Sequence, residues 1–166
     1  GNAGAHGGDM HGSLLYIETI TPQGEVRLSR DDLAFEYRSS ILKRAPRPLV
    51  ILRAALQLQP DDPDAIMARL EEFTARRKRT QPPGATIGST FKNPPGDYAG
   101  RLIDAAGLKG TRVGGAQISE VHANFFLNVG EASAADVKAL IDLARAAVLD
   151  KYGVQLELEI ELVGEW

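Results

Sequence analysis

The 166-residue sequence contains no cysteine, which excludes disulfide bridges, thiolate metal ligands and a cysteine nucleophile. It has no run of about 18 apolar residues and shows no basic-then-apolar leader, so we expect no membrane span and no secretion. The net charge of −3 gives no overall attraction to nucleic acid or anionic lipid. These absences favour a cytoplasmic protein that binds a small molecule, and they set no oligomeric state.

A glycine-rich opening, "GNAGAHGGD", stands where most chains have a methionine. It reads as the middle of a loop, so we expect an N-terminal portion to be missing. Small residues let backbone amides approach an anion or a flat ring closely. The GxGxxG of a dinucleotide fold and the GK[ST] of a P-loop are both lacking, so a cofactor loop and a flexible turn stay open. The three histidines, His6, His11 and His122, are too scattered to predict a metal site.

Hydrophobic patterning predicts an α+β fold in two parts, residues 1–81 and 82–166. In the first part, Pro22-Gln23-Gly24 lies between two apolar runs and indicates a hairpin. The segment "PLVILRAALQLQ" predicts a largely buried strand. A helix follows, for which Asp62 is the cap and Pro63 the first turn, and it ends in the cationic run "ARRKR".

The second part predicts two helices and two strands. The short helix covers about residues 98–106. The longer one begins at Ser133, with Asp136 at the capping-box position, and stops at Gly153. The segments "HANFFLNV" and "VQLELEIELV" predict strands, since the second alternates strictly between apolar and polar residues.

Two segments carry candidate chemistry in the second part. In "GSTFKNP", Gly88 permits a sharp backbone path that presents Ser89, and the absence of GxSxG favours a proton donor over a nucleophile. Lys92 and Asn93 can adjust its surroundings or bind a ligand; a structural loop held by side-chain hydrogen bonds is the alternative. In "LELEIEL", three glutamates share one face, where shielding would raise a carboxyl pKa, although a solvated face explains the pattern equally.

In the first part, Arg38 follows an apolar aromatic run in "AFEYRSS". Its planar guanidinium can grip a carboxylate with two parallel hydrogen bonds. A surface arginine is the alternative.

Taken in order, "GNAGAHGG", "YRSS", "GSTFKNP", "AGRLIDAAGLKG", "GGAQISEVHANFFLN" and "GVQLELEIELVG" resemble the UDP-N-acetylenolpyruvoylglucosamine reductase family of peptidoglycan precursor synthesis. The resemblance implies that NADPH reduces FAD and that the flavin then reduces the enolpyruvyl group of a UDP-sugar, forming UDP-N-acetylmuramate. It implies that Ser89 supplies a proton while Arg38 and Glu159 stabilise an enol-like intermediate. The implied substrate contacts are Asn93, Lys92 and His122, and the implied flavin contacts are Asn2, Ala3, Gly4 and Ala5.

The sequence departs from the family pattern at two places. The N-terminal flavin subdomain of the family has no counterpart in this sequence, so residues 1–81 resemble the rear half of an FAD-binding domain. Residues 82–166 resemble a substrate-binding domain. We therefore expect this chain alone to be inactive. Arg38 and Ser89 lie too close in sequence for the inserted tyrosine loop of longer members, which places the chain in the shorter subclass. The rival hypotheses are another FAD-linked oxidoreductase and a catalytically silent UDP-sugar-binding domain.

Overall fold

The computed structural model describes residues 1–44 and 49–165, and every strand pairing in this part of the chain is antiparallel. Helices and antiparallel sheets together confirm the predicted α+β class. Contacts divide the chain into two compact units, Gly1–Leu70 and Glu71–Trp166. This boundary falls inside a helix whose last residue is Thr80, whereas the division proposed from the sequence follows the end of that helix.

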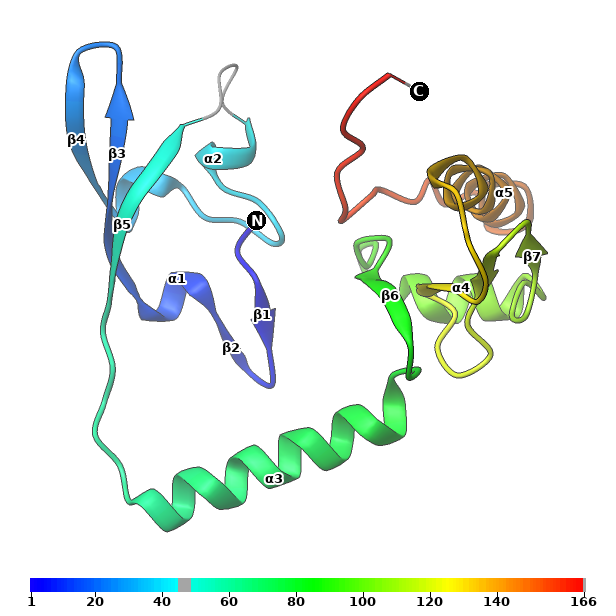
Figure 1. Ribbon diagram of the computed structural model, residues 1–166, viewed down its shortest axis with the longest axis horizontal. Coiled ribbons are helices and arrows are strands. Elements are labelled where there is room, and N and C mark those ends of the chain that lie inside the picture. Colours follow the sequence, from blue (N-terminus) through cyan, green and yellow to red (C-terminus); the bar gives the residue numbers. More distant parts are fainter. Residues whose placement is uncertain (45–48, 166) are drawn as a thin grey trace. The chain divides into compact units, whose positions relative to one another are not determined.

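The first unit contains two small sheets (Figure 1). A two-stranded hairpin leads into a short helix and then into a three-stranded sheet of order β4-β3-β5. The predicted turn is confirmed, because Thr21 pairs with Gly24 across it. The elements are β1 (Gly4–Ala5), β2 (Gly8–Asp9), α1 (Met10–Ser13), β3 (Leu14–Thr21), β4 (Gly24–Ser29), η1 (Asp31–Leu33), α2 (Ile41–Arg44) and β5 (Val50–Leu56).

The β5 strand is confirmed, but its predicted burial is wrong. Val50, Leu52 and Leu56 are 57%, 41% and 48% exposed. The physical reason is position, since β5 lies at the edge of its sheet and the buried cluster of this unit draws on other elements. The first residue of the predicted segment, Pro48, lies outside the described residues.

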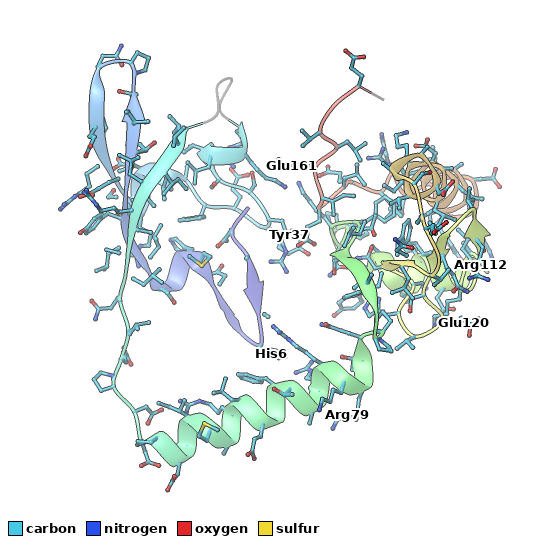
Figure 2. The ribbon with its side chains drawn as sticks, in the orientation of Figure 1. His6, Tyr37, Arg79, Arg112, Glu120 and Glu161 are labelled. Carbon is cyan, nitrogen blue, oxygen red and sulfur yellow. The ribbon has the colours of Figure 1, made fainter. Side chains whose placement is uncertain are left out.

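The predicted helix after β5 is α3 (Pro63–Thr80). Its cap is confirmed, because the Ala65 amide donates to Asp62 Oδ2 at 3.0 Å. Arg79 lies in its last turn, where positive charge interacts favourably with the helix dipole (Figure 2). None of the helices in residues 1–44 and 49–165 combines the length and apolar character needed to cross a membrane.

The second unit packs two helices on a four-stranded sheet of order β6-β9-β8-β7. Each predicted feature of the longer helix is confirmed: Ser133 caps it in a capping box with Asp136, and Gly153 ends it in the left-handed conformation. Leu140 and its apolar neighbours at helical spacing are fully buried. The elements are β6 (Ala85–Ser89), α4 (Ala99–Ala105), β7 (Arg112–Val113), β8 (Ala116–Ile118), β9 (Phe125–Asn128) and α5 (Ala134–Tyr152).

The last predicted strand is wrong as a strand. The segment after α5 carries the labelled Glu161 in Figure 2, and its residues up to 165 form one bridge, between Leu158 and Phe91, and no strand. An extended chain alternates its side chains whether or not a ladder of hydrogen bonds continues beside it. The alternation therefore indicates which side chains face the core and not that a strand is present. Leu156 is buried, and Leu158 is partly buried against the same core.

Candidate active site

A cavity of about 380 Å³ opens in the second unit and collects three of the predicted site residues, Ser89, Asn93 and His122. The rest of its lining comes from α4, from the loop after it and from the turn before β9. These further lining residues are Tyr98, Gly100, Arg101, Asp104, Lys109, Val121, Ala123 and Asn124.

The Ser89 hydroxyl is presented by an irregularity at the end of β6. Gly88 has φ +77, and the register between β6 and β9 shifts between Thr86 and Ser89. This confirms the sharp backbone path that Gly88 predicts. Ser89 is half-buried, and its hydroxyl makes no hydrogen bond to the described residues of its own unit. The hydroxyl is therefore placed to donate to a molecule in the cavity.

Lys92 and Asn93, three and four residues after Ser89, lie in different surroundings. Asn93 lines the cavity, and its Oδ1 accepts from the Ala99 amide at 3.1 Å, which satisfies a donor at the start of α4. Lys92 is not among the lining residues; its Nζ pairs with Glu157 Oε2 at 3.2 Å. The structure thus brings Asn93 to the Ser89 cavity and directs Lys92 to a carboxylate on the neighbouring segment.

Glu159 lies beside the serine segment without lining the cavity. Its amide donates to the Thr90 carbonyl oxygen at 2.9 Å, so it is bonded to the residue that follows Ser89. It is half-buried, whereas Glu157 and Glu161 are exposed. Glu159, the glutamate to which the family resemblance assigns a role, is therefore the most buried of the three.

His122 is held in a tight turn at the cavity wall. Its amide donates to Ser119 Oγ at 3.2 Å, and its Nδ1 accepts from the Asn124 amide at 3.2 Å. The neutral ring therefore carries its proton on Nε2. Burial lowers the pKa of His122, and the positive charge of Lys109 lowers it further. Near neutral pH, His122 is a neutral hydrogen-bonding group.

The charged lining residues were missed from the sequence. The Arg101 guanidinium pairs with the Asp97 carboxylate one helical turn away, which lowers the pKa of Asp97 to about 2. Lys109 Nζ pairs with Asp104 at 2.7 Å. The i,i+4 spacing of Asp97 and Arg101 was a readable signal, because such residues face each other on a helix. The cavity therefore has polar walls whose cations carry partner carboxylates.

In the first unit, Arg38 clamps the glycine-rich hairpin. Nη2 donates to the Gly4 carbonyl oxygen at 3.1 Å, and Nη1 donates to that of Asn2 at 3.4 Å. The guanidinium also lies 5.2 Å from the centre of the Tyr37 ring, within cation–π range. Arg38 has φ +53, an uncommon backbone for a residue other than glycine. The hairpin and the arginine are thus positioned by each other.

Of the predicted flavin residues, Gly4 and Ala5 form the first strand of this hairpin, and Asn2 and Ala3 directly precede it. The Asn2 side chain is 8% exposed, donates to Asp9 and to the Glu36 carbonyl oxygen at 3.1 Å each, and accepts from the His11 amide. A Cβ added at Gly4 would lie 2.9 Å from the Gly8 carbonyl oxygen, so this position requires glycine. An open cavity of about 500 Å³ lies next to the hairpin and is lined by Gly7, Gly8, Asp9, Gly12 and Ser13.

Comparison with known proteins gives concordant matches. Residues 80–163 match the family described as "UDP-N-acetylenolpyruvoylglucosamine reductase, C-terminal domain". The chain is 47% identical over 167 residues to the UDP-N-acetylenolpyruvoylglucosamine reductase of Chloroflexus aurantiacus, covering 98% of the chain and 56% of that relative. It is 44% identical over 164 residues to the enzyme of that name from Rubrobacter xylanophilus, covering 99% of the chain and 55% of the relative.

A solved structure matches as well. The crystal structure of UDP-N-acetylenolpyruvylglucosamine reductase from Thermus caldophilus has a TM-score of 0.82 and 39% identity, and the match covers 96% of this chain and 56% of that one. The chain spans about half the length of the curated relatives it matches.

Proposed function

We propose, from the premise that this chain belongs to the UDP-N-acetylenolpyruvoylglucosamine reductase family, that its protein reduces the enolpyruvyl group of UDP-N-acetylenolpyruvoylglucosamine in peptidoglycan precursor synthesis. The product is UDP-N-acetylmuramate, with NADPH as the reductant and FAD as the cofactor. One observation carries the proposal: Ser89, Asn93 and His122 line a single polar cavity in the part of the chain that matches the family.

The reaction needs a proton source. Hydride addition to the outer carbon of an enolpyruvyl ether builds negative charge on the inner carbon and its carboxylate. Ser89 supplies the proton to that carbon, because its hydroxyl lines the cavity and makes no hydrogen bond to the described residues of its unit. Asn93 and His122 contact the substrate from the same walls.

The developing charge also needs stabilisation. In this proposal Glu159 and Arg38 stabilise the enol-like intermediate. The hydrogen bond from the Glu159 amide to the Thr90 carbonyl oxygen supports this role, because it holds the backbone of Glu159 beside the serine segment. Arg38 carries a planar guanidinium suited to a carboxylate, and its two bonds to the glycine-rich hairpin fix its orientation.

The residues of the first unit fit part of a flavin. The open cavity beside the hairpin has glycine at three of its five lining positions, and a Cβ at Gly7 would meet no atom within 4 Å. Backbone of this kind admits a flat ring or a diphosphate at close range. We assign the contacts to Asn2, Ala3, Gly4 and Ala5, which belong to the same hairpin segment but do not line this cavity. Asn2 acts through its backbone because its carboxamide is already engaged. The chemistry that bound FAD would supply at this site is the transfer of a hydride from NADPH to the substrate.

The test uses the full-length gene product. Its visible flavin absorbance should bleach on addition of NADPH and return on addition of the enolpyruvyl substrate. Ser89→Ala should leave the bleaching rate unchanged and slow the return by ~10²–10⁴-fold, as expected for loss of general acid catalysis. Ser133→Ala is the matched control, since it removes a hydroxyl at the cap of α5 and should change neither rate.

Two outcomes would replace the proposal. Equal slowing of both half-reactions by Ser89→Ala would remove the proton-donor role and favour another FAD-linked oxidoreductase. A full-length protein that binds the UDP-sugar but no flavin would be a catalytically silent binding domain.

A further inference from the structure

Asn124 is a buried polar residue that binds the serine segment from one side. It is 3% exposed and directly precedes β9. Its Oδ1 accepts from the Phe91 amide at 2.9 Å, and its Nδ2 donates to the Phe91 carbonyl oxygen at 2.8 Å. Its own carbonyl oxygen accepts from the Thr90 amide at 2.9 Å. Three hydrogen bonds from one residue therefore hold two consecutive residues of the segment.

The other side of this segment is bonded to the chain that carries Glu159. The Thr90 carbonyl oxygen accepts from the Glu159 amide at 2.9 Å, and the Lys92 amide donates to the Glu157 carbonyl oxygen at 2.8 Å. In the described part of the chain, the Thr90 hydroxyl is buried without a hydrogen-bond partner. The segment is thus held here through its backbone, with Asn124 on one side and residues 157–159 on the other.

We propose that Asn124 is a positioning residue for the reaction, whose carboxamide sets the register of residues 90–92 and thereby places both the Ser89 hydroxyl and the Glu159 carboxyl group. The inference rests on the proposed function for the roles of Ser89 and Glu159. The Asn124 carboxamide bonds both the amide and the carbonyl oxygen of Phe91, as a residue on a neighbouring antiparallel strand would. At this side-chain length, only asparagine offers both a donor and an acceptor.

Asn124→Asp tests this role with little change in shape. The carboxylate still accepts from the Phe91 amide but cannot donate to the Phe91 carbonyl oxygen. One carboxylate oxygen then faces that carbonyl oxygen, and both are acceptors. Burial raises the pKa of a carboxyl group, so acidification should protonate it and restore a donor. The titratable or charged groups lining the same cavity are His122, Tyr98, Arg101, Asp104 and Lys109. They are present in both proteins, so rates are compared as the ratio of variant to wild type.

In the full-length flavin-loaded protein, Asn124→Asp should leave flavin reduction by NADPH unchanged. Reduction of the enolpyruvyl substrate should slow by ~10–10²-fold at about pH 8, the order expected from misplacement of catalytic groups by about 1 Å. The deficit should fall on kcat more than on KM and should shrink as the pH falls toward about 5.5.

Asn128→Asp is the matched control at the far end of β9. Its Oδ1 only accepts, from the Gly130 and Ala132 amides at 3.1 Å each, so a carboxylate can replace it. It should show no deficit that depends on pH. Near-normal substrate reduction by Asn124→Asp at about pH 8, or an equal loss in both half-reactions at every pH, would overturn the inference.

Amide hydrogen exchange separates this inference from the proposed function. At equal pH, Asn124→Asp should exchange faster than wild type at the amides of Thr90 and Glu159, whose bonds depend on the register of the segment, and Asn128→Asp should not. If the wild-type protein fails to reduce the enolpyruvyl substrate, the proposed function falls while the exchange result still decides the positioning role. Unchanged exchange at both amides would then overturn it.

Discussion

Gly100→Ala tests whether the histidine turn at the cavity wall is as rigid as its contacts indicate. Gly100 lies in α4, where alanine is normally the better residue by at most about 1 kcal/mol. A Cβ at this position would lie 2.7 Å from His122 Cε1 and 3.2 Å from Nδ1. Because real Cβ atoms essentially never approach so closely, either the imidazole or the helix must move.

The contacts of His122 decide which effect is larger. Its amide and its Nδ1 are both hydrogen-bonded, its carbonyl oxygen accepts from the Phe125 amide at 2.9 Å, and its ring packs 4.9 Å from the Phe125 ring. A side chain held in this way cannot move aside without losing bonds. Overpacking of this kind costs about 1–3 kcal/mol, which exceeds the helix-propensity gain. We therefore expect Gly100→Ala to destabilise the protein by about 1 kcal/mol.

The assay is urea denaturation followed by circular dichroism, with the slope of the transition checked for constancy. A double-mutant cycle with His122→Ala provides the control. In the His122→Ala background the clash is gone, so Gly100→Ala should stabilise by up to about 1 kcal/mol. The reasoning is refuted if Gly100→Ala stabilises the wild-type protein as much as it stabilises the His122→Ala variant.

Three further perturbations test other parts of the structure. Arg38→Lys keeps the charge but loses the planar fork that bonds two hairpin carbonyls; we expect much slower substrate reduction, measured by stopped flow, and near-normal turnover would contradict it. Ser133→Ala removes the capping box with Asp136 and should cost about 1 kcal/mol in urea denaturation, whereas Ser133→Asp should cost less because it retains an acceptor. His122→Gln tests the pH dependence of stability. Burial lowers the folded-state pKa of His122, so below its unfolded value of about 6.5 the unfolded state binds more protons than the folded state. The free energy of unfolding therefore decreases as the pH decreases. The variant should lose less stability than wild type between about pH 6.5 and pH 5, and parallel curves would count against this account.

The features read correctly from the sequence are those that local chemistry determines. In α5, the cap at Ser133 depends on Asp136 within the first turn, and the stop depends on Gly153 itself. The hairpin at Thr21–Gly24 depends on its own turn residues. The exposure of β5 follows no such rule, because a strand's pattern does not reveal whether another element covers it.

Asn124 shows the limit most clearly for the site. It lies inside "HANFFLN", a stretch that carried the family resemblance, yet nothing in its neighbourhood marks it as important. Its partner Phe91 is 33 positions away, and both side-chain bonds go to backbone atoms that every residue possesses. No residue type at position 91 could signal such a contact. Ser89 and Asn93 were identifiable because the roles proposed for them depend on their own side chains.

The three glutamates of "LELEIEL" show why one pattern supported both a correct and an incorrect prediction. Alternation requires only that the backbone be extended, and it correctly predicted apolar burial on one face of the segment. A strand also requires a continuous ladder of backbone hydrogen bonds. Here the backbone of residues 157–159 bonds to residues 90–92 around a single bridge between Leu158 and Phe91, and no ladder continues from it. Glu159 is thus half-buried because it stands at that bridge beside Thr90, while Glu157 and Glu161 on either side of it are exposed. If its place depends on this short contact, Glu159→Gln should keep the fold and slow only substrate reduction, whereas Glu161→Gln, the matched change two residues on, should leave both half-reactions unchanged. Equal rates for the two variants in stopped-flow measurements would show that the bridge places no catalytic carboxyl group.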